Sequence, residues 1–235
     1  MNLLRRKKKF IVVLIGAILL TPLLPRIGHT EIYLGGMGGY VAPMDLSDIS
    51  ATTGSGPTLR LNDAAFKGAA MAGGKVGYYF SSVKWLGIEM EGMFTTLLFK
   101  DQGQDASSGN LVGADSFEVT TWGINVIFRY PGERFQPYLG AGLGVFAAEL
   151  TLDTFGTASQ GLVPGINALA GIRAFLNDAK SVAAFVEYKY NYAQFEFSYP
   201  PASGLPAFQV DATYSANIAA AGVTVHFDIF PGSIL

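Results

Sequence analysis

The chain contains no cysteine, and charged residues make up only 14% of its 235 positions. The lack of cysteine excludes a disulfide framework and a thiolate metal site. The low charge leaves few lysines and glutamates to coat an ordinary water-soluble domain, although half of the residues are apolar. No apolar run of about 18 residues follows the N-terminal segment, and this argues against a membrane protein built from helices.

The first thirty residues follow a different pattern from the rest. Five basic residues, Arg5–Lys9, precede the apolar stretch FIVVLIGAILL, and Pro22 and Pro25 then break any helix. This order is typical of a secretory signal peptide. We predict a signal peptide over 1–30, a single domain over 31–230 and a short tail over 231–235, with Gly28–Thr30 as the best candidate for the cleavage site.

Loss of the signal peptide would change the charge balance. Six of the 16 basic residues and none of the 18 acidic ones lie within 1–30, so ten basic residues remain and the net charge becomes -8. Nucleic-acid binding needs a basic surface. We therefore expect no nucleic-acid partner.

Helical periodicity is nearly absent from the remaining chain, and alternation with a period of two dominates. It predicts eight strands: Glu31–Ala42, Ala64–Phe80, Trp85–Leu97, Ser116–Tyr130, Phe135–Leu150, Leu162–Leu176, Ser181–Phe197 and Asp211–Phe227.

The links between these strands alternate in length. The three short ones, SSVK, PGER and NDAK, have turn residues. The four long ones are rich in Gly, Ser, Asp and Pro: Pro43–Asp63, Leu98–Asp115, Thr151–Gly161 and Ser198–Val210. Short turns on one side and long loops on the other are typical of an outer-membrane barrel.

The two faces of the strands support this interpretation. One face carries aliphatic and aromatic residues, as in Trp122, Ile124 and Val126, and the opposite face carries glycines and polar residues. The charges within the strands share the glycine-bearing face: Lys75, Glu89, Glu91, Arg129, Arg173, Glu187 and Lys189. An apolar exterior with a polar interior fits a barrel surrounded by lipid.

At this point the sequence resembles the family of small OmpA-like outer-membrane β-barrel proteins. The residues that carry the resemblance are YLGGMGGY (Tyr33–Tyr40), KVGYYF (Lys75–Phe80), WLGIEMEG (Trp85–Gly92), INVIFRYPGERFQPYLGAGLGV (Ile124–Val145) and GVTVHF (Gly222–Phe227). The resemblance implies an all-β fold, an eight-stranded antiparallel up-and-down transmembrane barrel in the bacterial outer membrane. It also implies a C-terminal assembly signal at Gly222, Val225 and Phe227.

We expect outer-membrane lipid and the barrel-assembly machinery as partners, and a monomer. The long loops favour a structural or interaction role at the cell surface, with adhesion as one example, towards an extracellular ligand that the sequence does not identify. A narrow channel for small solutes is the alternative function, and a lipid A-modifying enzyme is a third.

No motif indicates an enzyme, a cofactor or a metal. GAGLGV (Gly140–Val145) lacks the spacing and the following helix of a dinucleotide site. Asp101–Asn110 lacks the sixth-position Gly and final Glu of a calcium loop. The two histidines, His29 and His226, fall in the signal peptide and at the periplasmic end of the last strand, so the loops lack the usual general base.

The seven interior charges have two interpretations. They could form an ion or proton path. Alternatively, they pair with one another and fill a lumen that eight strands make just wide enough for side chains. Three carboxylates against four cations are nearly balanced, and unpaired buried charges are costly. We expect packing, with Glu89 and Glu91 paired to some of the four cations.

Overall fold

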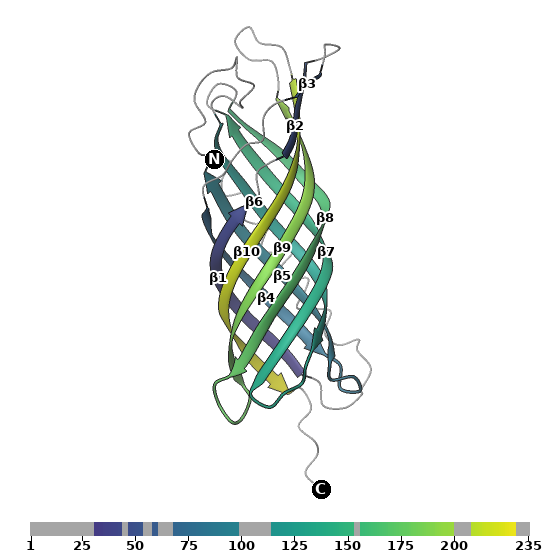
Figure 1. Cartoon of the computed structure of the whole chain (residues 1–235), viewed down its shortest axis with the longest axis vertical. Helices are drawn as coiled ribbons and strands as arrows, with labels where there is room; N and C mark the ends of the chain where they lie inside the picture. The colour runs from purple at the N-terminus through teal and green to yellow at the C-terminus, as the bar shows by residue number, and fades with distance from the viewer. Residues whose placement is uncertain are drawn as a thin grey trace, which may run out of the picture.

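The computed structural model describes residues 31–43, 47–53, 58–60, 68–98, 114–152, 156–199 and 208–228. Ten strands make up one antiparallel sheet (Figure 1). Their bounds are β1 Glu31–Pro43, β2 Ser47–Thr53, β3 Thr58–Arg60, β4 Ala69–Tyr79, β5 Leu86–Leu98, β6 Ala114–Arg129, β7 Phe135–Leu152, β8 Gly156–Phe175, β9 Val182–Tyr199 and β10 Phe208–Asp228. Among these residues no helix is long and apolar enough to cross a membrane.

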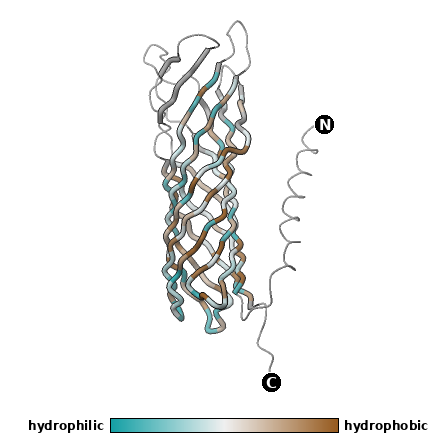
Figure 2. The backbone as a smooth tube through the Cα atoms, turned by 90° about the vertical axis from the view of Figure 1, so that its right-hand side faces the viewer, coloured by the Kyte–Doolittle hydropathy of each residue, from teal (hydrophilic) through white to brown (hydrophobic). Residues whose placement is uncertain are grey.

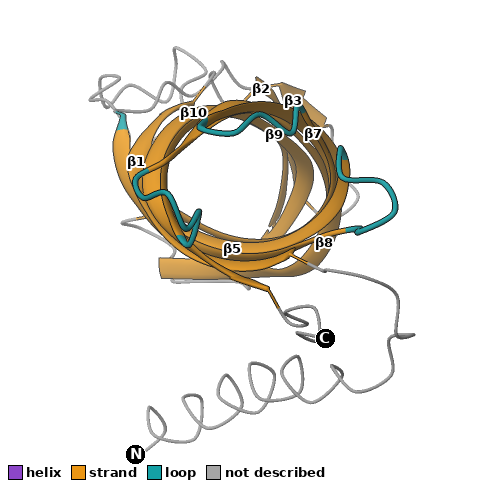
Figure 3. Ribbon diagram, turned by 90° about the horizontal axis from the view of Figure 1, so that it is seen from below, coloured by secondary structure: helices purple, strands orange, loops and turns teal. Residues whose placement is uncertain are grey.

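Eight of the strands close into a barrel. Neighbours follow the order β1-β4-β5-β6-β7-β8-β9-β10, and β10 pairs back onto β1 (Figure 3). A row of paired residues that starts at His226 returns to β10 at Ala216, ten residues away, after passing Tyr33, Gly77, Glu89, Asn125, Gly142, Asn167 and Asn191. This stagger tilts the strands and fixes the narrow diameter of the barrel.

The eight predicted strands are confirmed, with ends that shift by up to six residues. The prediction of a long loop over Thr151–Gly161 is wrong, because β7 continues to Leu152 and β8 already begins at Gly156. Two strands were missed. The segment Pro43–Asp63 was predicted to be a loop without regular structure, which is wrong. β2 takes over from β1 beyond Pro43 and pairs with β10 from Thr213 to Phe208, and β3 pairs with β2. Both lie at the top of the barrel (Figure 1).

The three short links lie together at the other end, shown at the bottom of Figure 1. In the turn between β8 and β9, the Asn177 side-chain oxygen accepts hydrogen bonds from the backbone N–H groups of Ser181 and Val182. Lys180 there has a φ of 51°, which is uncommon outside glycine. The predicted signal peptide and the tail 231–235 lie outside the described residues.

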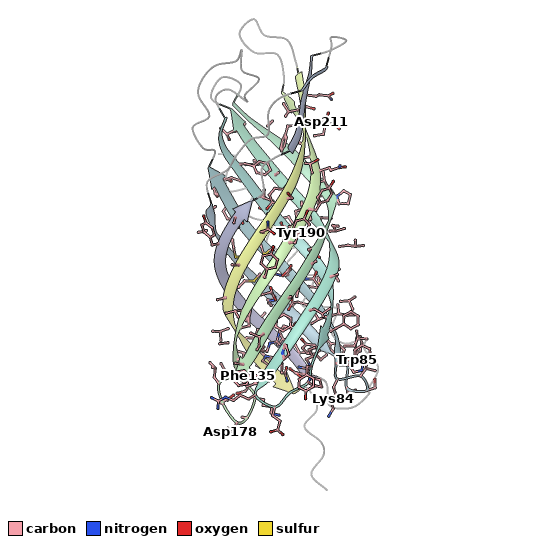
Figure 4. All side chains as sticks on the ribbon, viewed as in Figure 1. Lys84, Trp85, Phe135, Asp178, Tyr190 and Asp211 are labelled. Atoms are coloured by element: carbon pink, nitrogen blue, oxygen red, sulfur yellow. The ribbon has the colours of Figure 1, made fainter. Side chains whose placement is uncertain are left out.

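The two faces alternate along the strands as predicted, and Figure 2 shows the resulting mixture of brown and teal residues. In the lower part of the barrel the outer face is apolar: Ile124, Leu139, Leu143 and Val186 are each more than half exposed. The same face on β9 carries Tyr190 at mid-height (Figure 4). We call this lower region of the barrel, with its apolar outer face, the membrane part.

The polarity of the two faces reverses towards the external end of the strands. The external part consists of the ends of β6, β7, β9 and β10 beyond Trp122, Val145, Tyr192 and Ala219. Its outer face carries Thr120, Glu118, Glu149, Glu196 and Asp211, and Asp211 lies near the top of Figure 4. We predicted that no strand charge shares the aliphatic face, and these carboxylates show that this is wrong beyond the membrane. Water replaces lipid there, so the outer face is polar.

Candidate functional site: the filled lumen

Two lysines and three glutamates form a layer of ion pairs across the middle of the lumen. Lys75 on β4 lies 3.2 Å from a Glu89 oxygen and 2.8 Å from a Glu187 oxygen. Lys189 on β9 contacts Glu91 on β5, four strands away around the ring, and lies 2.9 Å from Glu187. All five side chains are at most 1% exposed. This central layer therefore joins opposite walls.

Tyrosines add further hydrogen bonds to the same carboxylates. The Tyr33 hydroxyl donates to Glu89 at 2.6 Å, and the Tyr138 hydroxyl donates to Glu187 at 2.8 Å. Asn167 donates to Glu91 at 3.4 Å. These contacts fix the orientation of the carboxylates, which offsets part of their desolvation cost.

Arg173 on β8 is buried in a different way. It is 1% exposed and forms no salt bridge with any residue that the structure describes. Its guanidinium carbon lies 4.3 Å from the centre of the Tyr33 ring and within 6 Å of the rings of Tyr79 and Tyr138. Cation–π contacts of this kind stabilise a desolvated cation. Arg173 thus fills an aromatic cage just below the central layer.

A second polar group closes the periplasmic mouth. Arg129 on β6 donates two hydrogen bonds to the Glu31 carboxylate on β1, at 2.9 and 2.5 Å, and donates to the carbonyl oxygen of Lys84 at 2.9 Å. His226 on β10 shares a hydrogen bond of 2.7 Å with Glu31 through Nδ1 and one of 2.9 Å with Thr224 through Nε2. Glu31 therefore joins the first strand to the last and to the opposite wall.

An aromatic cluster fills the lumen of the external part. Phe117 on β6 contacts Tyr214 on β10, four strands away, and Phe195 and Phe197 on β9, with ring centroids 5.8 to 6.1 Å apart. Phe117 and Phe197 are fully buried. Side chains therefore block the lumen at three levels: the mouth, the central layer and this cluster.

The mouth has the outline of a catalytic triad, with a hydroxyl, a histidine and a carboxylate in sequence. However, Thr224 is 0% exposed, so its hydroxyl offers no access to a substrate. The polar cavity at the mouth has a volume of about 310 Å³ and is lined by charged residues that include Lys84, Arg129, Asp178 and Lys180. The described residues include no group of three or more His, Asp and Glu that could hold a metal ion.

All seven predicted interior charges face the lumen and are buried. Five of them form the central layer, while Arg129 and Arg173 lie nearer the periplasmic mouth, apart from the three predicted glutamates, and Arg129 pairs with Glu31 instead. Glu31 was missed because it begins the first strand. The charge count indicated that one more carboxylate faces the lumen, since four predicted cations stood against only three predicted carboxylates.

The residues of the predicted assembly signal lie near the end of β10. Val225 and Phe227 face outwards and are 39% and 51% exposed, whereas Gly222 faces the lumen beneath the Phe185 ring. The structure thus places the two apolar residues on the lipid side. Whether they direct assembly stays a prediction.

Comparison with known proteins identifies the type of barrel. Residues 29–227 match the family described as "Outer membrane protein beta-barrel domain". None of the curated proteins compared with the chain matches it.

OprG and AlkL are among the solved structures that share the fold. The outer membrane protein OprG from Pseudomonas aeruginosa is 19% identical, with a TM-score of 0.65 over 86% of this chain and 97% of OprG. The outer membrane protein AlkL, determined in lipid bilayers, is 14% identical, with a TM-score of 0.56 over 91% of this chain and 98% of AlkL. At these identities the likeness shows the fold alone.

Proposed function

The chain belongs to the outer membrane protein β-barrel domain family and lies in the bacterial outer membrane, and on this premise we propose that it is a closed barrel with a structural or interaction role at the cell surface. The barrel would anchor its external segments and hold them away from the membrane. The observation that carries this proposal is the blocking of the lumen by side chains from opposite strands.

The external part supports the same role. Its strands continue beyond the apolar band, with carboxylates outside and Phe117, Phe195 and Tyr214 packed inside. Closely packed interiors are rigid. A packed extension of this kind would hold the external ends of β6, β7, β9 and β10 beyond the lipid headgroups.

The competing functions need features that the described residues do not provide. A channel for small solutes needs an open, hydrated path, and the central layer alone spans the lumen with side chains at most 1% exposed. A lipid-modifying enzyme needs a reachable nucleophile and base, and the nearest arrangement, at Thr224 and His226, is buried at the mouth.

The proposal can be tested by combining conductance with cell binding. The full chain, refolded into planar bilayers, should give no steady conductance. Intact cells that express it should bind immobilised extracellular-matrix proteins or glycans more strongly than cells without it. Replacement of residues 99–113 and 200–207 by short Gly-Ser linkers should abolish this difference.

The linker variant must remain a folded barrel, which a heat-dependent shift on gel electrophoresis shows. Steady conductance of the wild-type protein would overturn the proposal and favour the channel. Equal binding by cells with the native segments, with the linkers and without the chain would overturn the interaction role.

A further inference from the structure

Three buried side chains of different chemistry meet at one carboxylate of the central layer. The Lys189 ammonium on β9 contacts Oε2 of Glu91 on β5, and the Asn167 side-chain amide on β8 donates to Oε1 of the same carboxylate at 3.4 Å. Lys189, Glu91 and Asn167 are 1%, 5% and 4% exposed. An amine, a carboxyl group and a primary amide therefore lie together in a part of the lumen that excludes bulk water.

Strand register brings the three groups together. Asn167 pairs with Asn191, and Lys189 lies two residues before Asn191 on the same face of β9. The lysine and the amide are thus diagonal neighbours on adjacent strands, within reach of a long side chain. Gly123 on β6 pairs with Glu91, and a Cβ at Gly123 would lie 2.7 Å from the Asn167 side-chain nitrogen. This glycine leaves the space through which Asn167 reaches the carboxylate.

The other lysine of the central layer lacks such an arrangement. Lys75 contacts Glu89 and Glu187, and the further hydrogen bonds of these two carboxylates come from the hydroxyls of Tyr33 and Tyr138. In the described part of the chain, no side-chain amide donates to either of them. Lys189 is therefore the lysine that has both a carboxylate and an amide at hand.

An amine, an amide and a carboxyl group in a water-free interior can form an isopeptide bond. We propose that Lys189 and Asn167 become covalently joined in this way once the barrel has folded, with Glu91 as the proton carrier. Lys189 first passes a proton to Glu91, which leaves a neutral amine and a carboxylic acid, and burial favours this loss of two charges. Glu187, 2.9 Å from Lys189, keeps the amine in position.

The remaining steps exchange one C–N bond for another. Nζ of Lys189 attacks the side-chain carbonyl carbon of Asn167 and forms the new bond, while the bond from this carbon to Nδ2 breaks. Glu91 gives its proton to Nδ2, so that ammonia leaves, and takes a proton from Nζ in return. The Asn167 carbonyl oxygen has no hydrogen-bond partner among the described residues, so the amide group is free to turn during the reaction. The products are a secondary amide, ammonia and a neutral Glu91.

The bond would join two strands close to the point where their pairing ends. β8 and β9 are paired from Phe175 and Ala183 as far as Gly165 and Ala193. Asn167 lies two residues before that end. A covalent link at this position would keep the two strands from separating further into the membrane part.

The test is mass spectrometry of the chain before and after folding. The full chain is purified in urea, refolded into phosphatidylcholine vesicles and incubated at neutral pH. Its mass should fall by about 17 Da, which is one molecule of ammonia, whereas a sample kept in urea should retain its full mass. An unchanged mass of the folded barrel would overturn the proposal.

Trypsin digestion of the unfolded product locates the bond. One branched peptide should join residues 135–173 to residues 181–235, because trypsin no longer cuts after a modified Lys189. Fragmentation of this peptide should place the link at Asn167. Loss of ammonia from any other residue would also contradict the proposal.

Two matched variants test the role of the carboxyl group. Glu91→Gln keeps the shape of the side chain but cannot carry the proton, so the bond should not form. Glu89→Gln is the control, since Glu89 lies on the same strand and contacts Lys75 rather than Lys189, and this variant should still lose ammonia. Equal linkage in both variants would overturn the role of Glu91.

A further variant applies if Glu91→Gln fails to fold. Asn167→Asp replaces the leaving nitrogen by oxygen, so the same bond should form with loss of water, about 18 Da, instead of ammonia. Retention of the full mass by this folded variant would count against a bond at this position.

Discussion

The membrane part and the external part use the same strands with opposite polarity. On β9, Val186 and Tyr188 face lipid while Glu187 and Lys189 face the lumen. A few residues further on, Glu196 faces outwards, and Phe195 and Phe197 are buried inside. The pairing of β9 with β10 continues unchanged along both parts, whereas β8 pairs with β9 only as far as Ala193. The surrounding solvent, rather than the strand geometry, therefore decides which residues each face carries.

The difference also changes what holds the interior together. The external part is packed like the core of a water-soluble barrel, where apolar burial and aromatic contacts contribute most of the stability. The membrane part gains little from burial of apolar groups, because lipid already surrounds them. Its interior therefore depends on the pairing of Lys75, Glu91, Glu187 and Lys189.

The largest expected effect comes from breaking one ion pair in the membrane part. Glu91→Ala leaves Lys189 with one carboxylate fewer in a buried site and should lower the free energy of unfolding by about 3–5 kcal/mol. Adding Lys189→Met should recover part of this loss, because the stranded cation is removed. Urea titration of the barrel in vesicles measures both. Strictly additive losses would contradict a paired central layer.

A charge on the outer face should distinguish the two parts within one strand. Ile124→Arg places a cation in lipid and should cost about 2–4 kcal/mol. Thr120→Arg lies on the same face of β6, beyond Trp122, and should stay within about 0.5 kcal/mol of the wild type. The same urea titration compares them. Equal costs would mean that the boundary between the parts is misplaced.

Apolar exchange in the external part should cost less. Phe117→Leu keeps an apolar residue of similar size in the aromatic cluster and should lower stability by about 1–1.5 kcal/mol. The measurement is again the free energy of unfolding in vesicles, with Val119→Leu on the same strand as a comparison. A loss as large as that of Glu91→Ala would show that the two interiors do not differ in the way described.

The smallest effect is expected at the boundary itself. Tyr188→Phe removes the hydrogen bond to Asn217 and keeps the ring, so it should cost about 0.5 kcal/mol, at the low end for one hydrogen bond. Because Tyr188 is more than half exposed, the loss of stability should be smaller when water or a lipid headgroup can form a hydrogen bond with Asn217 in place of the tyrosine hydroxyl. Unfolding in vesicles with different headgroups tests this dependence.

The alternation of residues predicted the eight barrel strands and the lumen-facing position of all seven interior charges. It could not predict which charges pair. Glu91 contacts Lys189 four strands away because the stagger of the barrel brings these positions to one level, and stagger is a property of the whole sheet. The reversal of polarity was missed because a period of two is the same for both arrangements. Only Glu118, out of phase with Arg129 on β6, and Glu196, out of phase with Glu187 and Lys189 on β9, indicated it.

The contact between Glu31 and His226 has a consequence for the order of folding. The two residues are 195 positions apart in the chain, so their hydrogen bond forms only when the first strand meets the last. Contacts of such long sequence separation form late, after shorter loops have closed. Interactions absent from the transition state act on the unfolding rate rather than on the folding rate. The contacts of Glu31 with Arg129 and His226 therefore slow the unfolding of the finished barrel and leave its rate of folding unchanged.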